Sequence, residues 1–205
     1  LPIYLLKQIR REDELIPDPQ LSDQIVRMEH IAGRIFQTVV EQPGKAPQIG
    51  NHCFLAETAV IIGDVVIGDD CSVWYGAVIR GDVHSINIGN NTNIQDNAVI
   101  HATYKKSPTA IGNNVTIAHQ AVVHGCTLHD NVMVGIGAVI LDDVVVESNS
   151  IIAAGAVVTK GTVIPSGTVW AGVPARKVKD ISIDLLEGEV LRIAGAYGKY
   201  ASWYQ

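Results

Sequence analysis

The chain has 205 residues, a net charge of −6 and a pI near 5.6. This charge balance argues against a large basic surface for nucleic acid or anionic lipid, because neutralising phosphate groups requires clustered Lys and Arg side chains. No stretch approaches the ~18 to 20 uninterrupted apolar residues that cross a bilayer, so we expect a soluble protein with one domain.

Residues 1–50 show no repeat, and we interpret them as an N-terminal arm that leads into the domain. The three cysteines of the chain have no CxxC spacing, which favours a reducing compartment over a disulfide framework. The cytoplasm is therefore the expected location, and the mitochondrial matrix is the alternative.

A period of six residues governs the next segment, residues 51–175. The early run of recurrent aliphatic residues is Ile61, Ile67, Val73 and Ile79. The late run is Leu128, Val134, Ile140, Val146, Ile152, Val158 and Ile164, and it ends with the aromatic Trp170. At the fourth place after these positions comes a small or β-branched side chain, such as Ala77 or Ala138.

Six residues are too few for a pair of helices, so the repeating unit must be one short strand and one tight corner. Three units close a triangular coil, and successive coils stack ~4.8 Å apart with the recurrent aliphatic side chains in a dry core. The sequence therefore predicts an all-β domain, a parallel β-helix of hexapeptide repeats. Each interruption of the repeat predicts a loop, and the interruptions lie between Ile79 and Ile88, Ile100 and Ile111, and Val123 and Leu128.

Residues 176–205 leave the repeat. Apolar side chains recur there every three or four residues, which is typical of an amphipathic α-helix, and Ser182 is its expected N-cap. These apolar residues are Leu186, Val190, Ile193, Tyr197, Ala201 and Tyr204. We expect this helix to pack along the outside of the β-helix.

The repeat places three of the seven histidines. With three units per coil, Arg80, His101 and His124 form one column, and they face outward because side chains alternate along a strand. His101 and His124 then lie one coil apart on one flat face, near enough to share a metal ion. We interpret the remaining four as ordinary surface or hydrogen-bonded histidines: His30, His52, His84 and His129.

His119 lies around a corner, in the column that also holds Asp96. If three β-helices pack side by side, the corner of one chain meets the flat face of the next, and His119 can complete the site in trans. A cyclic homotrimer makes three equal sites in this way. Three neutral imidazoles leave an open coordination position for water, which is the arrangement of a catalytic zinc site.

Polar residues cluster in the segments VIRGD and NTNIQD, which contain Arg80, Asp82, Asn93, Gln95 and Asp96. We place Gln95 on a strand beside the histidine column and interpret it as a site residue. Asn93 is a weaker candidate, because Asn at a corner is typical of an ordinary turn.

The order VIRGD, NIQD, VIH, TIAHQAVVHGCT and WAGVPAR, from about Pro47 to about Lys179, resembles the γ-class carbonic anhydrases. The resemblance implies left-handed coils and metal ligation by His101, His119 and His124, with His119 from the adjacent subunit. It also implies reversible hydration of CO₂ to bicarbonate by a metal-bound hydroxide. Zn²⁺ is the expected cofactor, and Fe²⁺ or Co²⁺ are alternatives.

The same resemblance assigns roles to the polar residues. Gln95 would hold the metal-bound hydroxide, and Arg80 with Asp82 and Asp96 would form charge-assisted links at the subunit contact. The best-studied members carry proton-exporting glutamates directly after RGD and three residues after the first ligand histidine. Val83 and Tyr104 occupy those places here, so the usual proton shuttle is missing.

Two other functions fit parts of the sequence. An acyl-CoA-dependent acyltransferase would share the hexapeptide repeat and use one catalytic histidine without a metal, so stoichiometric zinc would argue against it. A non-catalytic subunit would resemble the γ-carbonic-anhydrase-like subunits of mitochondrial respiratory complex I, and isolation in a larger stable assembly would favour it.

Overall fold

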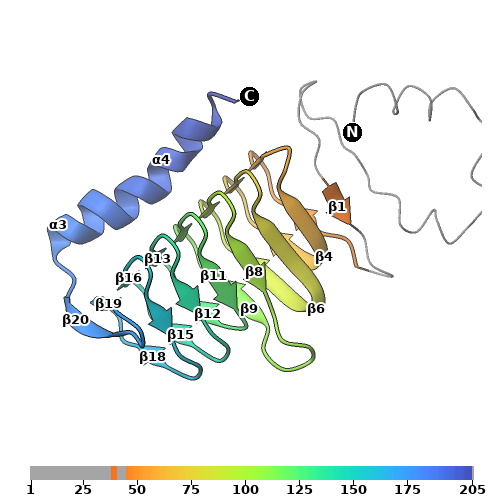
Figure 1. Ribbon diagram of the computed structural model, residues 1–205. Coiled ribbons are helices and arrows are strands. Elements are labelled where there is room, and N and C mark those ends of the chain that lie inside the picture. The colour runs from red at the N-terminus through yellow and green to blue at the C-terminus, as the bar shows by residue number, and fades with distance from the viewer. Residues whose placement is uncertain (1–37, 41–44, 205) are drawn as a thin grey trace, which may run out of the picture.

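Stacked parallel coils form the body of the protein, and a C-terminal helix runs alongside them (Figure 1). The computed structural model describes residues 38–40 and 45–204. Most of the predicted N-terminal arm, including His30, lies outside these residues. The predicted parallel β-helix is confirmed, and within the described residues no helix is long and apolar enough to cross a membrane.

One face of the triangular coil is an eight-stranded sheet. It contains β3 Phe54–Leu55, β5 Ser72–Val73, β7 Asn93–Ile94, β10 Thr116–Ile117, β13 Met133–Val134, β16 Ile151–Ile152, β19 Thr168–Ala171 and β20 Arg176–Asp180. All its pairings are parallel except that of β19 with β20.

The other two faces form one twelve-stranded sheet. The second face contains β4 Val60–Ile67, β6 Val78–Ile88, β8 Val99–His101, β11 Val122–His124, β14 Val139–Ile140 and β17 Val157–Val158. The third face contains β9 Thr109–Ile111, β12 Thr127–Leu128, β15 Val145–Val146 and β18 Val163–Ile164. β1 Thr38–Val40 and β2 Gln48–Ile49 pair with β4, so strand pairing begins before residue 51.

β6 runs across both of these faces, and the loop predicted between Ile79 and Ile88 is absent from it. The extra residues between Ile79 and Ile88 form no loop, because β6 continues unbroken around the corner. β4 follows it around the same corner, with a register shift between Gly63 and Val65. The backbone groups are therefore satisfied by strand pairing with an irregularity, and no loop is needed to absorb the additional residues.

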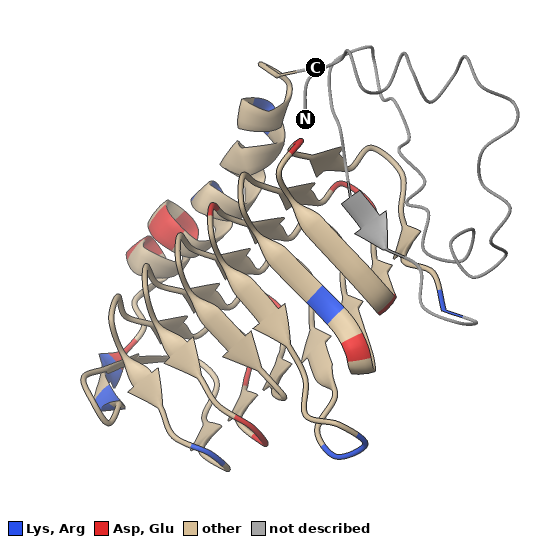
Figure 2. Cartoon of the chain, turned by 45° about the vertical axis from the view of Figure 1, so that its right-hand side comes forward, with Lys and Arg blue, Asp and Glu red and all other residues tan. Residues whose placement is uncertain are grey.

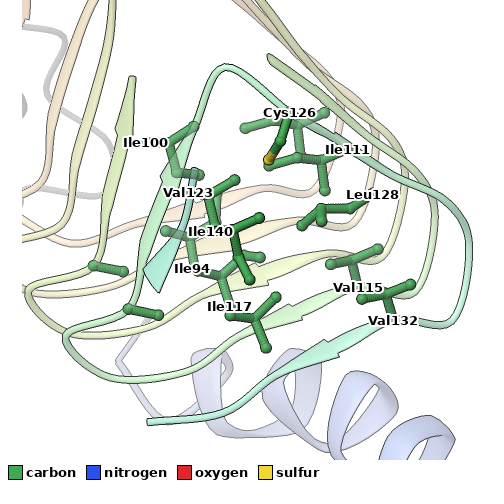
Figure 3. Packing of buried hydrophobic residues seen from close by; sticks show 14 of the residues in the cluster. Ile94, Ile100, Ile111, Val115, Ile117, Val123, Cys126, Leu128, Val132 and Ile140 are labelled. Carbon is green, nitrogen blue, oxygen red and sulfur yellow. The ribbon is translucent and has the colours of Figure 1, made fainter. Parts of the chain in front are cut away.

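The recurrent aliphatic side chains fill the interior of the coils. From Leu128 to Ile164, those of the late run are at most 1% exposed. Parallel in-register pairing stacks them on equivalent residues of the next coil, as Ile94 on Ile117 and Val123 on Ile140, and Figure 3 shows these side chains gathered inside. Each fully buried aliphatic side chain stabilises the fold by about 1.5–3 kcal/mol.

The C-terminal helical segment consists of α3 Ile183–Leu185, the π-helical turn η1 Leu186–Leu191, and α4 Arg192–Ala201. Ser182 is the N-cap, as predicted, because its hydroxyl accepts a hydrogen bond from the Leu185 N–H at 3.2 Å. The π-helical turn was not predicted. The segment covers the outside of the eight-stranded sheet, where Val190 packs with Ile151 and Val169, and Tyr197 contacts Trp74.

Candidate metal centre

His101 and His124 lie side by side at the ends of β8 and β11, where parallel pairing aligns them. His101 Nδ1 is 3.1 Å from His124 Nε2. Two nitrogens that ligate one tetrahedral Zn²⁺ at 2.0–2.1 Å lie roughly 3.3 Å from each other. The predicted placement of this pair is confirmed, and its spacing fits a shared metal ion.

Arg80 and Asp82 come from β6, next to the histidine pair. Figure 2 shows a basic and an acidic residue close together on this strand, although most strand surfaces carry neither. Asp82 Oδ1 is 3.0 Å from His101 Nε2, and Arg80 donates a hydrogen bond to the other Asp82 oxygen. Burial raises the pKa of Asp82, but the hydrogen bonds from Arg80 and His101 outweigh it and hold the pKa below its usual value.

His119 lies beyond β10, around a corner from this pair. Its Nδ1 is 2.9 Å from Asp96 Oδ2, so the predicted column of His119 and Asp96 is confirmed. Among the residues that the structure describes, no group of three or more His, Cys, Asp or Glu side chains within the chain could hold a metal ion. Within one chain, His119 lies beside one surface cavity and His124 beside another.

Gln95 differs from its predicted position. It follows β7 in the eight-stranded sheet and lies near His119, whereas His101 and His124 belong to the other sheet. The Gln95 side chain is 4% exposed, its Oε1 accepts a hydrogen bond from the His119 backbone N–H at 3.2 Å, and its Nε2 donates to Asn93. Gln95 therefore contacts His119 and not the pair of His101 and His124.

Asn93 is buried within β7, so its interpretation as a turn residue is wrong. Its Nδ2 donates a hydrogen bond to Thr116 Oγ1 at 2.9 Å, and its Oδ1 accepts the bond from Gln95. The first bond joins adjacent coils, and the second lies within one coil. Asn93 thus fixes the Gln95 amide that supports the backbone of His119.

Tyr104 lies at the tip of the loop that interrupts the repeat after Ile100, and here the predicted loop is confirmed. The loop closes where the Thr103 N–H donates to the Ser107 carbonyl at 3.0 Å. The Tyr104 side chain is 63% exposed, and its ring lies 5.0 Å from Lys105 Nζ. The structure does not bring Tyr104 into contact with the histidines.

Asp142 was missed in the sequence. Its Oδ1 is 2.6 Å from His124 Nδ1, and Thr103 Oγ1 donates to its Oδ2 at 2.7 Å. Burial raises the pKa of Asp142, but the hydrogen bonds from Thr103 and His124 outweigh it and lower the pKa. The only signal in the sequence was an Asp at a corner in the coil after His124, which looks like an ordinary turn residue.

Three of the other histidines have separate, ordinary partners. His52 lies 3.5 Å from Asp70, and His129 lies 3.8 Å from Glu147. His84 Nδ1 accepts a hydrogen bond from the backbone N–H of the next residue. Their interpretation as residues outside a metal site agrees with these contacts.

Each half of the candidate centre opens into a surface cavity. A cavity of 400 Å³ beside His124 is lined by Val122, Leu141, Asp142 and Lys160. One of 440 Å³ beside His119 is mostly aromatic and includes Asp96. Its other lining residues are Trp74, Tyr75, Tyr197, Tyr200, Trp203 and Tyr204.

Comparison with known proteins relates the chain to two groups. The family model described as bacterial transferase hexapeptide (six repeats) matches residues 46–81 and 125–160. "Gamma carbonic anhydrase 1, mitochondrial" of Arabidopsis thaliana is 48% identical over 151 residues, which cover 71% of this chain and 55% of that protein. The "Carbonic anhydrase" of Geobacillus kaustophilus is 38% identical over 162 residues, which cover 79% of this chain and 88% of the relative.

A solved structure of a hexapeptide transferase family protein from Anaplasma phagocytophilum has a TM-score of 0.78 and 40% identity to this chain. The alignment covers 82% of this chain and 98% of the other. By contrast, the chain spans little more than half the length of the Arabidopsis relative.

Proposed function

Because this chain belongs to the γ-class carbonic anhydrase family, we propose that it catalyses the reversible hydration of CO₂ to bicarbonate. The metal is Zn²⁺, with Fe²⁺ or Co²⁺ as alternatives. Its ligands are His101 and His124 of one chain and His119 of a neighbouring copy in a homotrimer.

One observation carries the proposal: each of the three histidines has a carboxylate at one ring nitrogen. Asp82 engages Nε2 of His101, Asp96 engages Nδ1 of His119, and Asp142 engages Nδ1 of His124. Carboxylate partners of this kind fix the tautomer of metal-ligating histidines and increase their basicity. The nitrogens that remain for a metal are His101 Nδ1, His119 Nε2 and His124 Nε2.

This donor set suits a catalytic centre more than a structural one. Three neutral imidazoles match the ligands of catalytic zinc sites, which keep one position open. Zinc bound in such a site lowers the pKa of water to about 7, which supplies a nucleophile for CO₂ at neutral pH. The protein's part is to orient the imidazoles through the carboxylates, while Arg80 offsets the charge of Asp82.

The separation of His119 from the other two histidines supports a homotrimer. Both halves of the site face the surface, and cyclic symmetry would bring the His119 corner of each chain to the His124 face of the next. The aromatic cavity beside His119 and the cavity beside His124 would then meet at the subunit contact.

Metal analysis combined with stopped-flow CO₂ hydration tests the proposal. We expect about one zinc per chain, and hydration that is lost together with zinc in a His124→Ala variant. His129→Ala is the matched control, because the His129 side chain pairs with Glu147 at 3.8 Å and is no part of the proposed site, so both measurements should stay unchanged.

The other two functions are outcomes of the same test. A metal-free protein that transfers acyl groups from acyl-CoA would favour the acyltransferase. A zinc-bound trimer that hydrates no CO₂ would favour the structural subunit, with respiratory complex I as a partner. The cytoplasm is the proposed compartment, and the mitochondrial matrix is the alternative, since the name of the Arabidopsis relative includes the word mitochondrial.

A further inference from the structure

We propose that Asp142 is a positioning residue that fixes the ring of His124 for metal binding and ties this ligand to the loop Thr103–Ser107. The inference rests on the proposed function, because it takes His124 as a metal ligand. It adds a residue from the coil after the histidine pair, one that the motifs VIRGD and NIQD do not contain.

Asp142 selects one tautomer of His124. An ionised carboxylate only accepts hydrogen bonds, so the short contact of 2.6 Å with Asp142 requires the proton on His124 Nδ1. The lone pair then lies on Nε2. This is the atom that faces His101 Nδ1 at 3.1 Å, so the tautomer that Asp142 selects directs the lone pair towards the shared site.

The backbone that follows His124 is shaped to hold Asp142. Gly125 has φ +57°, and a Cβ built on it would lie 2.5 Å from Asp142 Oδ1. A side chain at this position would therefore displace the carboxylate. The Asp143 N–H also donates to the Gly125 carbonyl at 2.7 Å. The corner after His124 leaves room for Asp142 and holds it against the histidine.

The second carboxylate oxygen of Asp142 binds the loop Thr103–Ser107. Thr103, two residues after His101, donates to this oxygen at 2.7 Å. At the other end of the loop, Ser107 donates to Asp143 at 2.5 Å, and Lys160 pairs with Asp143 at 3.3 Å. Two adjacent carboxylates thus hold both ends of the loop that carries Tyr104. Only Asp142 also contacts a histidine of the site.

This difference between neighbours gives a matched pair of variants. Asp142→Ala removes the contacts with both His124 and Thr103, and we expect zinc affinity, measured by competition with a chelator, to fall about 10- to 100-fold. Asp143→Asn disturbs the same loop without touching a histidine, and its zinc affinity should equal that of the wild type. Asp142→Asn, whose side-chain oxygen can still accept the His124 bond, should lie between the two.

A measurement on the metal-free protein separates this inference from the proposed function. In ¹⁵N-histidine-labelled protein, NMR should show the His124 proton on Nδ1 in the wild type and in Asp143→Asn, and a mixture of tautomers in Asp142→Ala. If the wild type bound no zinc, the proposed function would fail, whereas this measurement would still decide the role of Asp142.

Two results would overturn the inference. One is an Asp142→Ala variant whose zinc affinity and His124 tautomer are those of the wild type. The other is an Asp143→Asn variant that loses as much zinc affinity as Asp142→Ala, which would show that the loop alone matters. Thermal unfolding of each variant checks that the comparison is between folded proteins.

Discussion

His101 Nδ1 and His124 Nε2 face each other at 3.1 Å across two adjacent coils. The opposite nitrogen of each ring is bonded to a carboxylate from a further coil, Asp82 before the pair and Asp142 after it. Four successive coils therefore set the orientation of two side chains. Little rearrangement is needed for the pair to bind one metal ion, because both rings are already fixed by hydrogen bonds.

A site shared between chains should be rebuilt by mixing two inactive variants. His101→Ala and His119→Ala should each bind little zinc alone, because every site in either trimer lacks one ligand. After co-refolding in equal amounts, about a quarter of the sites should regain all three ligands, because each intact site needs one chain of each kind in a fixed order. Zinc content and CO₂ hydration measure the recovery.

Mixing His101→Ala with His124→Ala is the control. These residues belong to the same half of the site, so no combination of the two chains restores it. Recovery in this control as well as in the first mixture would contradict a site made from His119 of one chain and the pair of another.

Gln95→Ala should slow CO₂ hydration by about 10- to 100-fold while zinc stays bound. The reason is that Gln95 supports the His119 backbone and is proposed to orient the reacting water, but is no metal ligand. Stopped-flow rates and zinc content on the same sample separate the two effects. Zinc loss in proportion to the loss of rate would mean that Gln95 serves mainly to hold the third ligand.

The missing glutamates predict dependence on external buffer. With Val83 and Tyr104 in the shuttle places, no carboxylate carries the proton there. We expect kcat to rise and then saturate with imidazole buffer at constant ionic strength. The value of kcat/KM for CO₂ should stay nearly constant, because proton export follows the CO₂ step.

Replacing Tyr104 by Glu should reduce this buffer dependence, and the exposed loop tip should tolerate the change. Tyr104→Gln is the matched control, because it has the same size as the glutamate but carries no proton. A wild type that is fast without buffer would instead point to another carrier, such as His84.

The three thiols should differ in alkylation by iodoacetamide. A hydrogen bond with Cys71 lowers the pKa of Cys53, while the same contact and burial raise the pKa of Cys71. Burial raises the pKa of Cys126 to about 12. Because the thiolate is the reactive form, Cys53 should react first at about pH 8, and the other two only after unfolding. Peptide mass mapping, with a denatured sample as control, would refute this order if Cys126 reacted early.

Much of the fold could be predicted because the repeat is dictated by burial. Every sixth residue from Leu128 to Ile164 must fill the same interior, so the spacing directly gives the coils and the column of His101 and His124. The path of β6 could not be predicted in this way. Extra residues at a corner can form a loop or extend the strand. Which of the two occurs depends on whether the adjacent coil offers a strand to pair with.

Of the three carboxylates that contact the histidines, two could be predicted from the sequence and one could not. Asp82 and Asp96 stood out from the repeat and the polar segments VIRGD and NTNIQD, whereas Asp142 lies in the segment LDD, where Asp is common at turns. Its role depends on a diagonal contact with a side chain one coil away. The six-residue spacing predicts which residues share a column. The direction in which a side chain leaves a corner depends instead on local backbone angles, such as those of Gly125.

The C-terminal helical segment has a consequence for how the protein unfolds. Coils of a solenoid contact only their neighbours, so the ends of such a stack can fray independently of the middle. Here the chain returns along the stack, and contacts of Val190 with Val169 and of Tyr197 with Trp74 connect its last coils to its first. Fraying at either end therefore also breaks contacts of the helix. This coupling favours a single cooperative transition over progressive unzipping.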